Sequence, residues 1–225
     1  MNWKLLTKII VDVAMTLCLL LLMPYSLLGE TVHEWIGMAM LVLFLGHHFL
    51  NRKWIVSITK GKYSIYRGIQ ATLAGIMLLL MIGSMTSGIV ISNHIFHITK
   101  TFAVSEYARQ IHMFCAYWGF MVMAVHLGIH WNIVVVMMGR LFATRSVARQ
   151  WTARGTTILM AVYGVYAFQK RQFWDYLFLK THFLFIDAAD TIVWFMIDYL
   201  AVMILVVCIS YYVQKFSMLR RQRSL

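Results

Sequence analysis

Two pairs of histidines share one spacing in an otherwise strongly apolar chain. His33 and His47 lie fourteen residues apart, and so do His112 and His126. Fourteen residues of α-helix rise about 21 Å in nearly four turns, so both histidines of a pair project from roughly one face, near opposite ends of the helix. Haem iron takes two axial ligands, and neutral imidazole suits it. Two such helices side by side would supply two imidazoles at each of two levels, as two haem b groups require.

The composition indicates that these histidines belong to a membrane protein. Of the 225 residues, 61% are hydrophobic, 12% are charged and one is proline, whereas a soluble domain carries about a quarter charged residues. The net charge of +12 could suggest nucleic acid as a partner, but the basic residues lie between apolar runs, where they report membrane orientation. Membrane lipid is therefore the expected partner, and nucleic acid is not. The three cysteines, inside apolar runs and without a CxxC motif, are interpreted as small buried hydrophobes.

Six apolar runs approach the roughly 20 residues that a helix needs to cross the hydrocarbon core. The sequence thus predicts an all-α, polytopic, up-and-down bundle that forms a single membrane domain over residues 1–225. Lys4 and Lys8 precede the first run as in a signal peptide, but no small-residue cleavage site follows, so we expect a retained first helix. The predicted spans are Ile9–Leu28, Val32–Leu50, Gly68–Val90, Ile111–Met138, Ala153–Gln169 and Thr191–Val213.

The distribution of Lys and Arg predicts the orientation of these spans. With the N-terminus inside, only five of the twenty basic residues fall in outer segments, and the other fifteen are inner. This bias predicts that both termini lie in the cytoplasm. It also supports the short fifth span, without which the C-terminal RRQR would lie outside. The five outer residues are Lys100, Arg109, Lys170, Arg171 and Lys180.

In this topology the second and fourth helices run parallel, and both begin outside. His33 is then level with His112 near the outer surface, and His47 is level with His126 near the inner one. Residues 9–138 would form a four-helix haem-binding core with its cofactor slot between diagonal helices. Residues 139–225 would add two helices and an outer interfacial amphipathic segment at about 173–187, within the aromatic stretch FWDYLFLKTHFLF.

Several neighbours of the four histidines fit the same hypothesis. Gly119 stands seven residues from both His112 and His126, where a larger side chain would crowd a porphyrin, and Gly37 lies one turn beyond His33. Arg109 and Arg52, at helix ends, could pair with haem propionates or could simply anchor the helices.

His48 and His130 are alternatives to His47 and His126 as ligands. His48 would point about 100° away from His47, so equal spacing favours His47 and His126. His48 and His130 could instead bind propionates, line a substrate site or lie at the interface, since a lone histidine at a helix end is more often interfacial than a ligand.

Further ionisable residues lie outside or within the spans. His94, His97 and His182, with Glu106, Asp187 and Asp190 near them in sequence, could form an outer metal or proton-coupled quinone site, or could be ordinary interfacial residues. Asp12 and Asp198 lie inside apolar runs and are expected to face the bundle, because charged groups in membranes avoid lipid. For Asp198 we expect a hydrogen bond to a neighbouring helix rather than a proton path.

The segments HEWIG, HH and NRKW, followed by HLGIHW, resemble an uncharacterised bacterial membrane family thought to be cytochrome b-like. More distantly, the paired histidines resemble the di-haem b of quinol-oxidising complexes. The resemblance covers residues 9 to 138, and His33, His47, His112 and His126 match the ligand positions. It implies electron transfer across the membrane with a quinone, a flavin or a redox protein at either end.

The sequence therefore favours a di-haem b-type cytochrome, acting alone or as the membrane-anchor subunit of an oxidoreductase. The expected cofactors are two haem b groups, with quinone as a candidate substrate. No nucleotide-binding GxGxxG motif is present, so a flavin would have to be carried by a partner. The alternatives are a proton-coupled transporter or channel that relays protons through its histidines, and a non-redox membrane scaffold.

Overall fold

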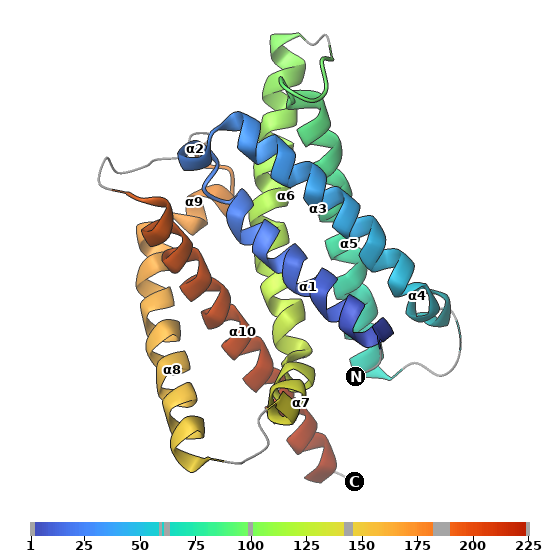
Figure 1. The fold of residues 1–225 in the computed structure, drawn as a ribbon, viewed down its shortest axis with the longest axis vertical. Coiled ribbons are helices and arrows are strands. Elements are labelled where there is room, and N and C mark those ends of the chain that lie inside the picture. Colours follow the sequence, from blue (N-terminus) through green and yellow to red (C-terminus); the bar gives the residue numbers. More distant parts are fainter. Residues whose placement is uncertain are drawn as a thin grey trace.

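A computed structural model describes residues 3–58, 60, 64–98, 101–141, 146–181 and 190–223 of the chain. Within these ranges the chain forms ten helices and no strand, so the predicted all-α class is confirmed. The long helices lie side by side as a bundle (Figure 1).

Four helices are long and apolar enough to cross a membrane: α1 (Trp3–Leu22), α5 (Ile65–Ile91), α6 (Phe102–Ile129) and α10 (Ile192–Arg223, of which Ile192–Ser217 is the apolar part). They correspond to the predicted first, third, fourth and sixth spans. The predicted second and fifth spans are the helices α3 (Glu30–Leu50) and α8 (Val147–Lys170). Both are long enough to cross a membrane but are not among the four helices of the described residues that combine that length with a sufficiently apolar composition, so the structure supports a membrane protein with four candidate spans.

Two of the predicted spans have the wrong boundaries. The run Ile9–Leu28 is not one helix, because α1 ends at Leu22 and a turn with Pro24 leads into the short α2 (Tyr25–Leu28). Proline lacks the N–H that would continue the helix and disfavours helical geometry in the residue before it. Gly29, with a φ of +83°, then turns the chain into α3.

The predicted span Ile111–Met138 is also divided. The helix α6 begins at Phe102, where the Thr101 hydroxyl accepts a hydrogen bond from the Val104 N–H at 3.4 Å. A side-chain cap of this kind starts a helix in polar sequence that hydropathy alone assigns to a loop. At the other end α6 stops at Ile129, and α7 (Trp131–Leu141) follows as a separate helix.

The best-packed part of the molecule lies between α6, α8, α9 (Phe173–Leu177) and α10. The rings of Phe120, Phe173 and Tyr199 pack edge to face or tilted, with centroids 5.0 to 5.8 Å apart. A Cβ on Gly164 would meet the backbone of Ala201, so this glycine lets α8 approach α10 closely.

The predicted outer amphipathic segment begins with the helix α9, which has five residues. Phe173, Tyr176 and Leu177 are buried against the bundle, whereas Trp174 and Phe178 are 50% and 55% exposed. The aromatic residues of the segment therefore divide between a buried and an exposed face. Residues 182–189 lie outside the described part of the chain.

The histidine-bearing helices belong to different pairs of packed helices. The helix α3 packs on α1, and α6 packs on α5 and α10. In Figure 1 the α1–α3 pair runs obliquely to the α5–α6 pair, and α3 and α6 both descend from the end where α2 lies toward the end where α4 (Arg52–Ile58) and α7 lie. The parallel direction predicted for the two helices is thus observed.

Candidate functional site: two groups of histidines

The structure brings His33 and His112 together, and we call them the outer pair. Their ring centroids are 6.0 Å apart, with the ring planes at 70°. The two residues are 79 positions apart in the chain and come from α3 and α6. The names outer and inner follow the orientation that the basic residues predict.

His112 is held in place by α5. Its Nδ1 lies 2.9 Å from the backbone carbonyl of Ser84, to which it can donate a hydrogen bond, and 3.4 Å from the Ser87 hydroxyl. A Cβ on Gly88 would lie 3.2 Å from the His112 ring, so this glycine makes room for the imidazole. Donation from Nδ1 leaves the Nε2 lone pair of His112 available for a metal.

His33 lies in a more apolar environment. The Tyr25 ring meets it edge to face at 5.1 Å, and the backbone of Leu22 hydrogen-bonds its ring. Its Nδ1 is buried without a hydrogen-bond partner. Such an atom costs about 1–3 kcal/mol unless something pairs with it. A ring with one nitrogen bonded and the other unpaired, beside a second imidazole, has the chemistry of a metal ligand.

The inner group consists of His47, His48, His126 and His130. His47 Nδ1 contacts a carboxylate oxygen of Asp12 on α1 at 2.7 Å. The Asn51 amide also approaches His47, and Lys8 donates to Asn51 at 2.9 Å. The rings of His126 and His130 lie 4.7 Å apart, and His126 is within electrostatic reach of His47 and Asp12.

The alternative histidines also make contacts that orient their rings. His48 Nδ1 lies 2.9 Å from the Phe44 carbonyl on its own helix, and its ring packs on Phe44. His130 Nε2 lies 3.4 Å from the Gln70 amide on α5. His47 differs from both in contacting a carboxylate, whereas His126 contacts the ring of His130.

The remaining predicted site residues lie around these groups. A Cβ on Gly37 or Gly119 would meet no atom within 4 Å, so open space adjoins both glycines. Arg109 is exposed, one turn before His112, and is within electrostatic reach of Tyr25. Arg52 is exposed, with its guanidinium 4.7 Å from the Phe49 ring centroid. Among the described residues, no carboxylate forms an ion pair with either arginine.

The outer histidines do not assemble as the sequence suggested. His94 joins Glu30 and Glu34, with its Nε2 3.7 Å from a Glu30 oxygen, while His97 is exposed. The Glu34 carboxylate accepts hydrogen bonds from the Ser92 hydroxyl at 2.7 Å and from backbone N–H groups of residues 93–95. It thus fastens the end of α5 to α3. His182 and Asp187 lie outside the described residues.

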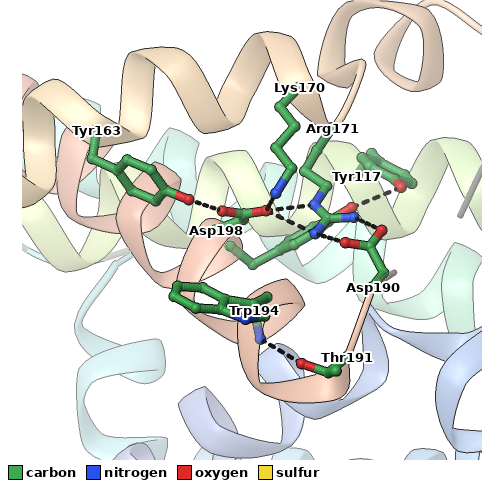
Figure 2. A network of polar contacts seen from close by, with 9 residues as sticks. Tyr117, Tyr163, Lys170, Arg171, Asp190, Thr191, Trp194 and Asp198 are labelled. Carbon is green, nitrogen blue, oxygen red and sulfur yellow. Dashed lines mark hydrogen bonds and ion pairs between the residues drawn. The ribbon is translucent and has the colours of Figure 1, made fainter. Parts of the chain in front are cut away.

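An ionic network joins α8, with Arg171 at its end, to α10 and to Asp190 before it (Figure 2). Asp198, fully buried, accepts hydrogen bonds from Tyr163 at 2.5 Å, Lys170 at 2.9 Å and Arg171 Nε at 2.8 Å. Arg171 also donates from both terminal nitrogens to Asp190, at 2.5 and 2.8 Å. The hydrogen bond expected from Asp198 to a neighbouring helix is therefore confirmed.

This network gives partners to two residues that the sequence analysis considered. Asp190 pairs with Arg171, and Arg171 also pairs with Asp198. Burial acts to lower the pKa of the Arg171 guanidinium, but its hydrogen bonds to Asp190 and Asp198 outweigh burial and raise the pKa. Two sequence features could have predicted this ion pair: an aspartate inside an apolar run, and an arginine at the end of the preceding helix. Asp12, by contrast, is 54% exposed and faces His47 from the surface of α1.

The outer pair fits a haem iron in donor type and spacing. Two imidazole nitrogens that bind one metal ion, each at about 2 Å, would lie about 4 Å apart. Each ring centroid lies about 1 Å behind its nitrogen, so the expected distance between the two ring centroids is about 6 Å. The observed separation is 6.0 Å.

Comparison of the chain with protein families, with curated proteins and with solved structures gave no match.

Proposed function

We propose that the chain is a di-haem b-type cytochrome of the bacterial plasma membrane, with six spans and both termini in the cytoplasm. In this proposal α3 and α8 cross the membrane along with α1, α5, α6 and α10. Electrons pass between a quinol, flavin or redox-protein donor and an acceptor on the other face, and the chain acts alone or as the membrane anchor of an oxidoreductase. The resemblance to cytochrome b-like proteins points the same way.

The observation that carries the proposal is the meeting of His33 and His112. Two imidazoles from helices that pack on different partners approach to 6.0 Å, one with a free Nε2 lone pair and the other with an unpaired buried nitrogen. A membrane interior makes unpaired polar groups costly, which favours a functional reason for their retention. His47 and His126 each lie fourteen residues beyond the outer histidine of the same helix, so a single coincidence of spacing is a poor explanation.

The protein's own residues would bind and orient the cofactors. His33 and His112 would hold one haem b at the outer level, and His47 and His126 would hold the other at the inner level. Ser84 and Asp12 fix the ring orientation of His112 and His47 by hydrogen bonds. Gly37 and Gly119 leave space beside the helices. When bound, haem supplies a one-electron couple at iron.

Two other classes of function use the same residues differently. A proton-coupled transporter would use His47, His126 and His130 as a relay, and a scaffold would need no cofactor. A transporter of the inverted-repeat type is disfavoured because α3 and α6 run parallel rather than inverted (Figure 1). Haem content separates the cytochrome from both alternatives.

The first experiment is a pyridine haemochrome assay with a dithionite-reduced minus oxidised spectrum on the purified, detergent-solubilised chain. We expect two haem b per chain after expression with ample haem supply. A chain that folds but contains no haem would refute the proposal.

Single variants then test the assignment of ligands. We expect His33→Ala and His112→Ala each to remove one haem, and His47→Ala to remove the other. The matched control is His97→Ala, since His97 is an exposed histidine outside both groups. Loss of both haems in every variant, or of none, would contradict two separate sites.

A further inference from the structure

We propose that Asp12 is a positioning residue that makes the inner haem the lower-potential site, so that electrons run from the inner level to the outer level. This inference rests on the proposed function and adds a direction to it. It comes from a difference between the two histidine groups that is visible only in the folded chain.

At the inner level a ligand contacts a carboxylate. Asp12 Oδ1 lies 2.7 Å from His47 Nδ1, and Asp12 is also within electrostatic reach of His126. The contact joins α1 to α3, the two helices that pack on each other. A hydrogen bond from imidazole N–H to a carboxylate fixes the tautomer and makes the other ring nitrogen a stronger donor to a metal. It also places a full negative charge beside the ligand.

At the outer level the corresponding contacts are to neutral groups. His112 Nδ1 approaches the Ser84 carbonyl at 2.9 Å and the Ser87 hydroxyl at 3.4 Å. His33 is hydrogen-bonded by the backbone of Leu22. Both outer rings therefore have backbone carbonyls where His47 has a carboxylate. Glu34, next to His33 in the chain, acts on His33 electrostatically, while its carboxylate accepts hydrogen bonds from the hydroxyl and N–H donors of residues 92–95 rather than from an outer imidazole.

This difference has a definite sign for the redox potentials. A more strongly donating axial imidazole and an adjacent negative charge favour oxidised over reduced iron, so they lower the potential. An electron moving from the inner to the outer level oxidises one iron and reduces the other, which balances without a proton or a co-reactant. In a cell with a negative interior, this direction is also favoured by the membrane potential.

The basic residues of the inner side act in the opposite sense, because positive charge favours reduced iron. Lys8 donates to Asn51, a neighbour of His47, but contacts the amide oxygen and not the ring. Arg52 is exposed and lies over Phe49, so its charge is screened by solvent and salt. Direct contact gives Asp12 the larger influence on His47.

The test is a spectroelectrochemical titration of the purified protein containing both haems. His112→Ala, which leaves only the inner haem, assigns the two transitions. We expect the inner transition to lie at the lower potential in the wild type. In Asp12→Asn we expect it to rise so that the reduced-to-oxidised ratio at a fixed potential increases at least tenfold, which is about 59 mV for one electron. The outer transition should not move.

Two further variants serve as controls. Asp12→Glu keeps the charge and should keep the inner transition below the outer one. Asp175→Asn removes the same charge at an acid that is 42% exposed and far from either group in the fold, near α9, and should move neither transition.

The inference is overturned if the inner transition lies above the outer one in the wild type, or if Asp12→Asn moves both transitions equally or neither. Should Asp12→Asn lose the inner haem, the wild-type order still decides the question. A wild-type chain without haem would instead refute the proposed function itself, so the two failures are distinguishable.

Discussion

Substitution of Asp198 by Asn tests whether the ionic network holds α8 and α10 together. Asn has almost the same shape and retains one acceptor oxygen, but it removes the negative charge. Asp198 is fully buried and faces donors from Tyr163, Lys170 and Arg171. The substitution leaves these donors, two of them cationic, around a neutral amide whose NH₂ group cannot accept from any of them.

The structure sets the expected size of the effect. Removing one partner of a buried ion pair costs about 3–5 kcal/mol, because the other charge remains desolvated. Asp190 continues to pair with both terminal nitrogens of Arg171, which places the expected loss near the lower limit, at about 3 kcal/mol. For a chain of this length each kcal/mol corresponds to about 2–4 °C, so the apparent Tm should fall by about 6–12 °C.

The assay is thermal unfolding in detergent, followed by circular dichroism at one fixed scan rate because unfolding of such proteins is often irreversible. Asp175→Asn is the matched control, since Asp175 is partly exposed and 3.9 Å from Lys180. An exposed pair contributes about 0–1 kcal/mol, so its Tm should change little. If Asp198→Asn unfolds within 2 °C of Asp175→Asn, a threshold set from about 0.5–1 kcal/mol, the network does not stabilise the fold.

Two other substitutions probe contacts between neighbouring helices. Gly164→Ala should destabilise the protein by about 1–3 kcal/mol, because its Cβ would meet the backbone of Ala201. The control Gly155→Ala, where a Cβ meets nothing within 4 Å, should be neutral or slightly stabilising. Equal Tm values for the two variants would contradict close α8–α10 packing. Glu34→Gln should speed hydrogen exchange at the backbone amides of residues 93–95, which donate to Glu34 in the structure; unchanged exchange rates there would show that this carboxylate does not hold the segment.

The helical membrane class could be predicted from the sequence because it depends on local properties. Runs of apolar residues long enough to cross a bilayer require no knowledge of packing. The fourteen-residue spacing likewise depends only on the rise and turn of one helix. From these two features the sequence predicted that His33 and His112 would be level on parallel helices, and their rings are 6.0 Å apart in the fold.

The ends of the helices and the helices on which each one packs were harder to predict from the sequence. Pro24 ends α1 and Thr101 begins α6 through single backbone and side-chain effects, which a hydropathy average over many residues hides. The helix α10 was expected to lie outside the haem-binding core, yet it packs on α6 and contributes Tyr199 to the buried aromatic cluster.

The partners of charged and polar side chains were decided only by the tertiary structure. Asp12 meets His47 across 35 residues of chain, and Arg171 meets Asp198 across 27. A charged residue in an apolar run indicates that some partner must exist, since an unpaired charge is costly in a membrane. Which partner it finds depends on how the helices rotate and cross, and those angles follow from side-chain packing between helices. The sequence alone determined the apolar helices and the spacing of the histidines along them, and the packing of α1 on α3 decided that the carboxylate of Asp12 contacts His47.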